Sequence, residues 1–496
     1  MGLPHAIGLI FSMLHASQAT PEEIARIREK RFRRLLRTAV AKSPFYRDLY
    51  RNIDIETCRL ADLPVVDKPT MMANFDDFVT DRRLKKAQIS RWLEDKNNLG
   101  KMYLGKYVAF HTSGTTGENA LIVYDRHALD YVHAALIARH AQPQQMTMLE
   151  ILGILLKALL IKRLSLTAIL MTGGPYPAYT IASYPPPFHQ LIVKENIHSL
   201  LDPVPKIVEK LNGSCCNELY SYPTMLDILA REQLAGRLKL NIEEPLATIV
   251  SASEPLTETT KHLVQRAWGM KIQDTYGSSE CILMARSCGK FERMHVMTDL
   301  CCLEIVDRHR MPVPDGQTGD KLLLTNLFNS TQPFIRYEVN DVTGYSTQSC
   351  SCGQPFPTLL PVEGRTDDIF YIDRPGSGYD AVHPYLFLGP IVELTQVREY
   401  QLVQTGRNEV TFSYVPVHSG AGVENKVRKV LEDGLRQAGL INRVTLNTLC
   451  VENIPRDIRS GKIRQIMSRV GAPADLDDNL LKTSPRHRRD IKDELS

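Results

Sequence analysis

The chain has 496 residues, which is long enough for two or more domains with a large buried core. Its 43% hydrophobic and 23% charged residues are ordinary for a globular enzyme, and its net charge of +4 is too small to indicate a nucleic-acid partner, so we expect none. Ten cysteines without the regular spacing of small secreted domains argue against a disulfide scaffold and favour a reducing, cytoplasmic location.

The N-terminal part is expected to be helical. Met1–Leu14 is mildly apolar but lacks a basic segment and a cleavage site, so we expect no signal peptide. Residues 20–52 predict an amphipathic helix, because Thr20 suits an N-cap and Pro21 suits the first helical position. The basic run Arg26–Arg37 is typical of a solvated helix face.

Small hydroxylated residues and glycines alternate in the run His-Thr-Ser-Gly-Thr-Thr-Gly at positions 111–117. Backbone N–H groups in such a turn form an anion-binding concavity, and the hydroxyls add donors for phosphate oxygens. Apolar segments at 107–110 and 120–124 flank the run and predict strand, phosphate turn, strand. A Walker P-loop is excluded because it needs a lysine and a following helix. The alternative is a simple Ser/Thr/Gly surface turn.

The most apolar stretch is Leu149–Met171. Lys157, Lys162 and Arg163 interrupt it, so the uncharged run is too short to span a bilayer and we expect no transmembrane segment. The stretch predicts a buried helix followed by a core strand. Peripheral membrane contact is the alternative.

Strands and helical segments alternate from about residue 107 to 345, which predicts a layered α/β domain. The segments expected there are a strand at 246–251, a helix at Leu256–Trp268, and strands at Lys271–Thr275 and Lys321–Thr325, with a turn at 312–316 between the last two.

A second, smaller α/β unit is expected after a hinge at Gly364–Asp368. It would contain strands near 399–405 and 409–415 and the helix Val423–Gln437. The predicted division is therefore 1–366 for a large N-terminal domain and 367–475 for a small mobile C-terminal domain. Residues 476–496 are basic and are predicted to form a disordered tail.

Five motifs in order carry a resemblance to a known family. They are Ala-Lys-Ser-Pro-Phe-Tyr-Arg at 41–47 with Leu-Pro-Val-Val-Asp-Lys at 63–68, the phosphate turn, Thr-Tyr-Gly-Ser-Ser-Glu at 275–280, Gly-Arg-Thr-Asp-Asp at 364–368, and Arg-Ser-Gly-Lys-Ile-Arg at 459–464. In this order and spacing the chain resembles the adenylate-forming superfamily of acyl-CoA synthetases and adenylation domains, and most closely the phenylacetate-CoA ligase branch.

The resemblance implies an AMP-forming ligase. A carboxylate would attack the α-phosphorus of ATP to give an acyl-adenylate and pyrophosphate, and a thiol, usually that of coenzyme A, would then displace AMP. The acid is expected to be an aryl or other hydrophobic carboxylic acid. The enzyme would use ATP, Mg²⁺ and coenzyme A.

The resemblance also assigns roles to residues. The β- and γ-phosphates would be held by Thr112, Ser113, Gly114, Thr115, Thr116 and Gly117. The adenine would lie beside a wall formed by Ser253, Glu254 and Pro255, and Tyr276, followed by Gly277, would stack on it.

The remaining roles concern the metal, the ribose and the mobile domain. Glu280 would bind Mg²⁺, Asp341 would accept the ribose hydroxyls, and Arg365 would contact the nucleotide. Asp367 would be the hinge, and Lys462 would be the mobile catalytic lysine.

Two departures from the family pattern matter: the first weakens the match to ordinary ATP handling, and the second leaves the acceptor open. The phosphate turn continues with Glu118-Asn119 where Lys-Pro is usual, and the segment at 373–380 differs from the usual glycine-rich loop that faces the second half-reaction. Transfer to an amine or a carrier-protein thiol is therefore an alternative to coenzyme A. A nucleotide-binding module without catalysis is a second alternative, against which Glu280 and Lys462 argue.

Two further groups of residues are candidates for binding. Cys288, His295, Cys350 and Cys352 form a Cys-x6-His…Cys-x-Cys set, whose N and S ligands suit a structural Zn²⁺. Some members of the branch carry zinc with this ligand order. The alternative is that the thiols are buried as small hydrophobic groups. Tyr176 and Tyr222 are candidate walls of the acid pocket, although aromatic residues in an α/β core more often serve packing.

Overall fold

The computed structural model describes residues 3–112, 120–140, 148–254, 256–290, 293–307, 309–362, 370–376, 378–382, 396–417, 422–455 and 466–470. Within these residues, no helix is long and apolar enough to cross a membrane.

The N-terminal region is helical, as expected. The prediction of a single helix over 20–52 is wrong, because two helices occupy this segment. The helix ends at Lys42 and a second begins at Pro44, because proline disfavours helical backbone in the residue before it. Ser43 then caps the second helix, with its Oγ accepting the backbone N–H of Tyr46. The elements of this region are α1 (Leu3–Ala16), α2 (Pro21–Lys42), α3 (Pro44–Leu49), the 3₁₀ turns Leu60–Asp62 and Lys96–Asn98, α4 (Lys68–Ala73), α5 (Phe75–Phe78) and α6 (Lys86–Glu94).

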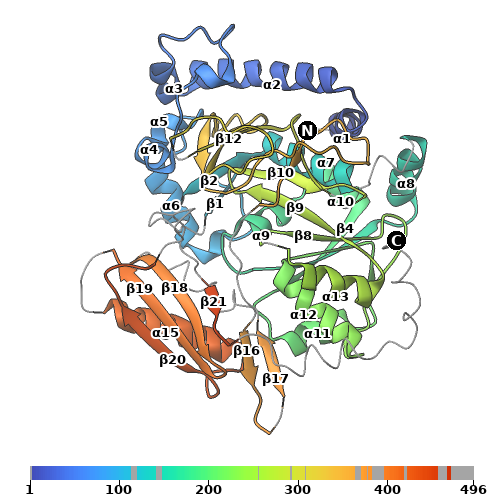
Figure 1. Ribbon diagram of the computed structural model, residues 1–496, viewed down its shortest axis with the longest axis vertical. Helices are drawn as coiled ribbons and strands as arrows, with labels where there is room; N and C mark the ends of the chain where they lie inside the picture. Colours follow the sequence, from blue (N-terminus) through green and yellow to red (C-terminus); the bar gives the residue numbers. More distant parts are fainter. Residues whose placement is uncertain are drawn as a thin grey trace.

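An eight-stranded mixed sheet forms the centre of the fold (Figure 1). Strands β4, β3, β6, β8 and β9 are parallel, and β10, β11 and β15 continue the sheet antiparallel from β9. In spatial order the strands are β15 (Thr358–Leu359), β11 (Met294–Val296), β10 (Cys281–Ser287), β9 (Ile272–Ser278), β8 (Thr248–Ala252), β6 (Glu218–Ser221), β3 (Leu164–Leu170) and β4 (Val193–Ser199).

Helices cover both faces of this sheet, as expected for a layered α/β domain. One apolar core packs α1, α7 (Arg126–His140), α8 (Met148–Leu160) and α10 (Pro187–Ile192) together with β1 and β2. The other packs α11 (Val204–Leu211), α12 (Pro223–Leu234) and α13 (Glu258–Trp268) against the opposite face. A short helix, α9 (Pro177–Ala182), follows β3.

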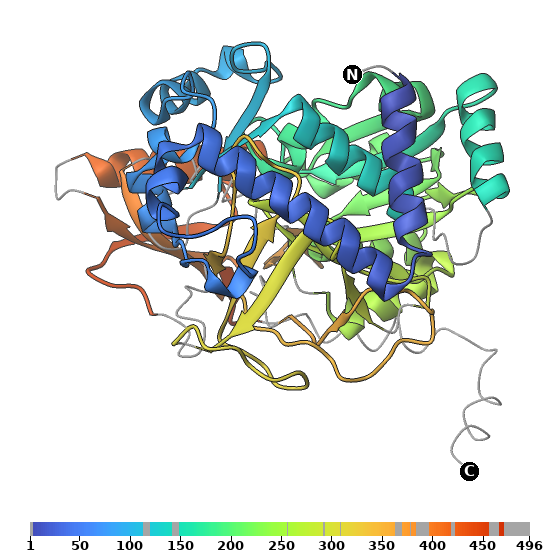
Figure 2. The ribbon, with the colours of Figure 1, turned by 90° about the horizontal axis from the view of Figure 1, so that it is seen from above.

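The predicted buried helix and core strand within 149–171 are α8 and β3, but α8 is only partly buried. Ile151 and Ala158 face the core, whereas Leu149, Leu160 and the following Ile161 are exposed. Figure 2 shows α8 at the periphery of the molecule.

Smaller sheets complete the part of the chain before residue 363. The hairpin β1 (Tyr107–His111) and β2 (Leu121–Asp125) confirms the strands predicted on either side of the phosphate turn. The antiparallel sheet β12 (Cys301–Val306), β13 (Lys321–Asn326) and β14 (Tyr337–Val339) and the short pair β5 (Cys215–Cys216) and β7 (Asn241–Ile242) are the others.

The C-terminal part of the described chain forms its own sheets and core. Phe412 and Leu431 are among the residues that pack α15 (Val423–Gln437) onto the sheet, and α15 has the predicted bounds. The elements are the hairpin β16 (Phe370–Asp373) and β17 (Tyr379–Val382), and the sheet β20 (Thr445–Cys450), β19 (Glu409–Pro416), β18 (Val397–Gly406) and β21 (Ile466–Ser468).

Candidate active site

A large cavity of about 1660 Å³ is lined by residues along the parallel strands and includes the loops at their carboxyl ends. Ligands of open α/β sheets bind at these ends, because the loops that follow adjacent strands converge there. Tyr176 follows β3, Tyr222 follows β6, and Ser253 and Glu254 follow β8; Tyr276 lies near the end of β9. All five residues line the cavity, so the fold brings together positions separated by 100 residues.

Tyr276 and Asp341 form the central polar contact of the cavity. The Tyr276 hydroxyl donates to Oδ2 of Asp341 at 2.7 Å, and both residues line the cavity. Burial, together with the Asp341 carboxylate, raises the pKa of Tyr276 well above its usual value, so the phenol stays a donor. Gly277 is required here because a Cβ would lie 2.0 Å from the carbonyl oxygen of Ile282.

Glu280 lines the same cavity and is half-buried. Burial raises its pKa, whereas hydrogen bonds from its own backbone and from Ser278 and Tyr337, and the positive charge of Lys68, lower it. The Asn326 amide donates to the backbone carbonyl of Glu280 at 2.7 Å and holds the turn after β9.

Lys68 and Tyr337 are site residues to which the sequence analysis gave no role. Val66 forms a parallel bridge to Tyr337, with its N–H donating to the Arg336 carbonyl at 3.1 Å. This pairing places Lys68, at the start of α4, on the cavity wall that carries Glu280. The Leu-Pro-x-x-x-Lys motif contains Lys68, but the sequence analysis used this motif only to support the family resemblance.

Thr112 is the part of the phosphate turn that the structure describes. Its backbone N–H donates to the Ala120 carbonyl at 2.9 Å and its hydroxyl accepts the Ala120 N–H at 3.0 Å, which closes the β1–β2 hairpin. Thr112 and its neighbour His111 line the cavity. Burial lowers the pKa of His111 to about 4, so this ring is neutral at pH 7.

The segment after β8 is held in an unusual backbone conformation. Ser253 has φ of 74°, the left-handed region that non-glycine residues rarely occupy. Glu254 accepts both the backbone N–H of Thr224, at 3.1 Å, and its hydroxyl, at 2.8 Å. These bonds fasten the segment to the start of α12, and both residues line the cavity.

The part of the cavity beneath α7 and α10 has apolar walls and one polar cluster. Its apolar lining includes Leu136, Ile137, Ile151, Leu155 and Ile181. Tyr176 and Tyr222, the candidate walls of an acid pocket, are buried and line the cavity. The polar cluster is His133, His189 and Glu195, whose ligand-type atoms all lie within 4.8 Å of one another.

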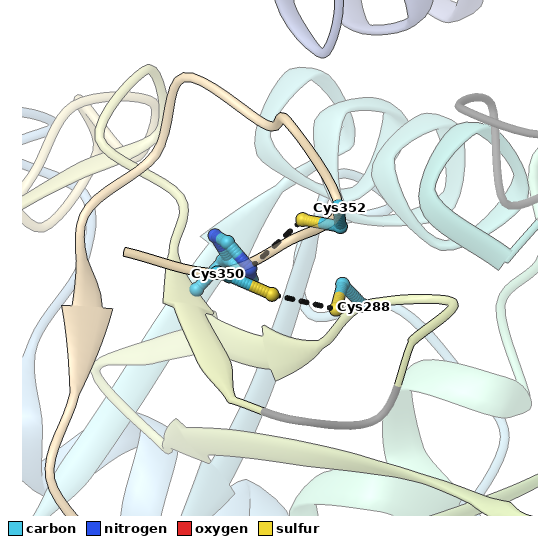
Figure 3. Close-up of side chains that lie close together, drawn as sticks. Cys288, Cys350 and Cys352 are labelled. Atoms are coloured by element: carbon cyan, nitrogen blue, oxygen red, sulfur yellow. Dashed lines mark hydrogen bonds between the residues drawn. The ribbon is translucent and has the colours of Figure 1, made fainter. Parts of the chain in front are cut away.

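The thiols and imidazole predicted to bind zinc also come together (Figure 3). Cys288 Sγ lies 3.5 Å from Cys350 Sγ, and Cys352 Sγ lies 3.3 Å from His295 Nε2. A tetrahedral Zn²⁺ with bonds of about 2.3 Å to sulfur and 2.0 Å to nitrogen requires separations of about 3.8 and 3.5 Å. The observed distances therefore fit four zinc ligands.

The surroundings of the Cys/His set support the same arrangement. His295 Nδ1 lies 2.9 Å from the Phe356 carbonyl, which leaves Nε2 to face the thiols. The Gln354 N–H donates to Cys352 Sγ, and Gly353 has φ of 73°, which allows the tight turn after Cys352. Among the described residues, none of these four ligands lines the large cavity, so the set stands apart from it.

Several predicted site residues lie outside the described part of the chain. They are Ser113, Gly114, Thr115, Thr116, Gly117, Pro255, Arg365, Asp367 and Lys462.

Comparison with known proteins places this geometry in a known fold. No family model matches the chain. A phenylacetate-coenzyme A ligase of Thermus thermophilus is 33% identical over 135 residues, which are 26% of this chain and 30% of that protein. The chain thus matches less than a third of the length of this curated relative.

Solved structures match along nearly the whole chain. The structure of 2-hydroxyisobutyryl-CoA ligase with 2-HIB-AMP and CoA, in its thioesterification state, has a TM-score of 0.56 at 18% identity and covers 94% of both chains. The same enzyme in its postadenylation state with R3-HIB-AMP has a TM-score of 0.51, again at 18% identity and 94% coverage of both chains.

The protein therefore has the fold of the adenylate-forming ligases. Its motifs resemble the phenylacetate-CoA ligase branch, and the local match to the Thermus thermophilus enzyme confirms that resemblance.

Proposed function

We propose that the protein is an AMP-forming ligase that activates an aryl or other hydrophobic carboxylic acid with ATP and transfers the acyl group to coenzyme A. The observation that carries this proposal is the convergence of Thr112, Tyr276, Glu280 and Asp341 on one cavity that includes the loops at the carboxyl ends of the parallel strands. The apolar walls beneath α7 supply a place for a hydrophobic acid. The related Thermus thermophilus enzyme is a phenylacetate-coenzyme A ligase.

In this proposal each residue has a definite task. The Tyr276 ring would stack on adenine while its hydroxyl keeps Asp341 oriented toward the ribose hydroxyls. Thr112 and the following turn would bind the terminal phosphates. Positioning of the carboxylate against the α-phosphorus, with neutralisation of phosphate charge, accounts for most of the rate enhancement expected in such a reaction.

The Glu280 carboxyl group fits a Mg²⁺ ligand. It lies half-buried on the cavity wall, and an anionic oxygen at such a position suits a hard cation that also bridges phosphates. When bound, Mg²⁺ would offset phosphate charge during adenylation.

Lys68 would provide a fixed positive charge near the phosphates. The phosphate turn carries Glu118-Asn119 in place of the usual Lys-Pro and so lacks one cation. Lys68 lines the same cavity as Thr112 and Glu280, and its positive charge acts to lower the pKa of Glu280. We therefore assign to Lys68 part of the electrostatic role that the missing lysine would have.

The proposal includes two domains and a structural zinc ion. Residues 367–475 would rotate about Asp367, so that Lys462 enters the site for adenylation and leaves it for thioester formation, with Arg365 at the nucleotide. Cys288, His295, Cys350 and Cys352 would bind Zn²⁺ with no open position, which suits a structural role. Free thiols and the use of coenzyme A agree with a cytoplasmic location.

Two measurements on the same preparation test this function. Pyrophosphate release with hydroxylamine trapping is followed over a panel of aryl, fatty and short-chain acids, with Glu280→Gln as the inactive control. Acid-dependent release that Glu280→Gln abolishes is the expected result. No release with any acid, together with binding of ATP, would favour the non-catalytic module.

Repeating the assay with and without coenzyme A identifies the acceptor. Formation of the acyl-CoA is expected. If the adenylate forms but reacts only with an amine or a carrier-protein thiol, that compound is the acceptor in place of coenzyme A. The adenylation step of the proposal would then still stand.

A further inference from the structure

A second cluster of metal-ligand side chains lies away from the cysteines. His133 comes from α7, His189 from α10 and Glu195 from β4, and their ligand-type atoms lie within 4.8 Å of one another. His189 Nδ1 is 3.4 Å from Glu195 Oε1, and the two imidazole rings meet edge to face at 4.9 Å between centroids. Three elements from different parts of the chain thus converge on one point.

The two histidines of the cluster are buried, so their polar ring nitrogens are costly without compensation. His133 and His189 are 2% and 4% exposed. Neither ring nitrogen of His133 has a well-formed hydrogen bond among the described residues. The carboxyl group of Glu218 is an electrostatic neighbour of Glu195, because both residues pair with Leu166, one on each side of β3.

We propose that His133, His189 and Glu195 bind a divalent transition-metal ion, with Zn²⁺ as the best match. Two imidazole nitrogens and one carboxylate oxygen are a common protein ligand set for zinc. Bonds of about 2.0–2.2 Å in a tetrahedron require ligand separations of about 3.3 Å, close to the 3.4 Å between His189 and Glu195.

The site differs from the Cys/His set in one important way. All three ligands line the large cavity, and three ligands leave a fourth position of the tetrahedron open. If the proposed function holds, the acid's distal end would face this position, so an acid with a metal-binding oxygen or nitrogen would gain a contact there. The metal site itself does not depend on that function.

The test is metal content, which is independent of catalysis. The full-length protein, purified without a metal-affinity step, is equilibrated with Zn²⁺, dialysed against metal-free buffer and analysed for zinc per chain. Glu195→Gln and His189→Gln keep size and hydrogen bonding but remove a good ligand. His198→Gln is the matched control, because His198 is on the same strand three residues from Glu195 and so points to the other face.

The expected result is that Glu195→Gln and His189→Gln each lose about one zinc per chain, while His198→Gln loses none. Cys350→Ser should leave this zinc in place, and adding Glu195→Gln to Cys350→Ser should remove it. Circular dichroism checks that each variant folds. If His189→Gln does not fold, the zinc content of Glu195→Gln decides the test. Unchanged zinc in folded Glu195→Gln would overturn the proposal and leave a hydrogen-bonded cluster.

An independent observation concerns α8. The helix exposes an apolar face that includes Leu149 and Leu160, 80% and 77% exposed, and continues to Ile161, 76% exposed. Leu152, Leu156 and Leu159 are also exposed, so apolar side chains recur at helical spacing on the solvent side. A helix that is apolar on its outer face as well as its core face indicates an interaction surface.

Basic residues accompany this face. Lys157 lies within the helix, and Lys162 and Arg163 follow it; all three are exposed, against one acidic residue, Glu150. Leucines that insert at the headgroup level beside cations that bind anionic lipid are the features of an interfacial helix. We also propose that α8 docks on an anionic lipid surface.

Co-sedimentation with vesicles tests this surface. The protein is mixed with phosphatidylcholine vesicles that contain or lack phosphatidylglycerol. Leu156→Glu and Leu160→Glu alter exposed side chains, and Met311→Glu, 60% exposed elsewhere, is the control. We expect binding to anionic vesicles that weakens at high salt. The two α8 variants should abolish this binding, and Met311→Glu should not. No binding, or a dimer in light scattering that the same variants dissociate, would overturn it.

Discussion

The hydrogen bond between Tyr276 and Asp341 should set the affinity for ATP. Tyr276→Phe keeps the ring that would stack on adenine and removes only the hydroxyl. A hydrogen bond to a charged group contributes about 1.5–3 kcal/mol. Because Asp341 keeps a further interaction, we take the lower part of this range, about 1.5–2 kcal/mol. The KM for ATP should therefore rise about 10- to 30-fold, with a smaller change in kcat.

Tyr345→Phe is the matched control. Its hydroxyl donates to the Leu303 carbonyl at 2.9 Å, and among the described residues Tyr345 does not line the cavity. Both variants should lose stability, because each removes a partly buried hydrogen bond. Only Tyr276→Phe should raise the KM for ATP.

The assay is ATP–pyrophosphate exchange at varied ATP, with urea unfolding of the same preparations. An unchanged KM in Tyr276→Phe despite lower stability would refute the role of this bond in the site. An equal rise of KM in both variants would show that the effect comes from general loosening of the fold.

The remaining predictions concern one residue each. Lys462→Ala should slow adenylate formation roughly 10²–10³-fold and leave the conversion of a supplied acyl-adenylate nearly unchanged; equal loss in both half-reactions would argue against rotation. Lys68→Met should slow adenylate formation about 10-fold or more, whereas Lys106→Met, an exposed residue outside the cavity, should have no effect in the same assay. Cys350→Ser should reduce zinc at the Cys/His set from about one per chain to none and lower the thermal midpoint, because structural zinc contributes to folding; full zinc occupancy in this variant would remove Cys350 from the ligand set.

Local elements were largely predictable from the sequence. The strands beside the phosphate turn, the helix Val423–Gln437 and the two strands before it follow from short-range patterns, and the structure has them within a few residues. The break at Ser43-Pro44 was missed because the apolar periodicity continues across it. The bend depends on the backbone restriction that proline imposes.

Burial was the main feature that local patterns misjudged. The basic run Arg26–Arg37 predicted a solvated face, yet Arg31 is buried and pairs with Asp299 at 3.5 Å, as does Arg139 at 2.9 Å. Conversely, the apolar α8 predicted a buried helix and has an exposed face. Whether a side chain meets protein or water depends on elements far away in the chain.

The sequence by itself determined the order of the motifs and the residue types that suit phosphate, Mg²⁺ and Zn²⁺. It predicted the Cys/His set from residue types and order, but only the tertiary structure brings Cys288 and Cys350, 62 residues apart, to 3.5 Å between their Sγ atoms. Only the tertiary structure decided that Lys68 lies on the wall with Glu280, since a bridge between Val66 and Tyr337 joins segments about 270 residues apart. The same holds for His133, His189 and Glu195, which share no motif and meet only because α7 and α10 pack over one face of the sheet.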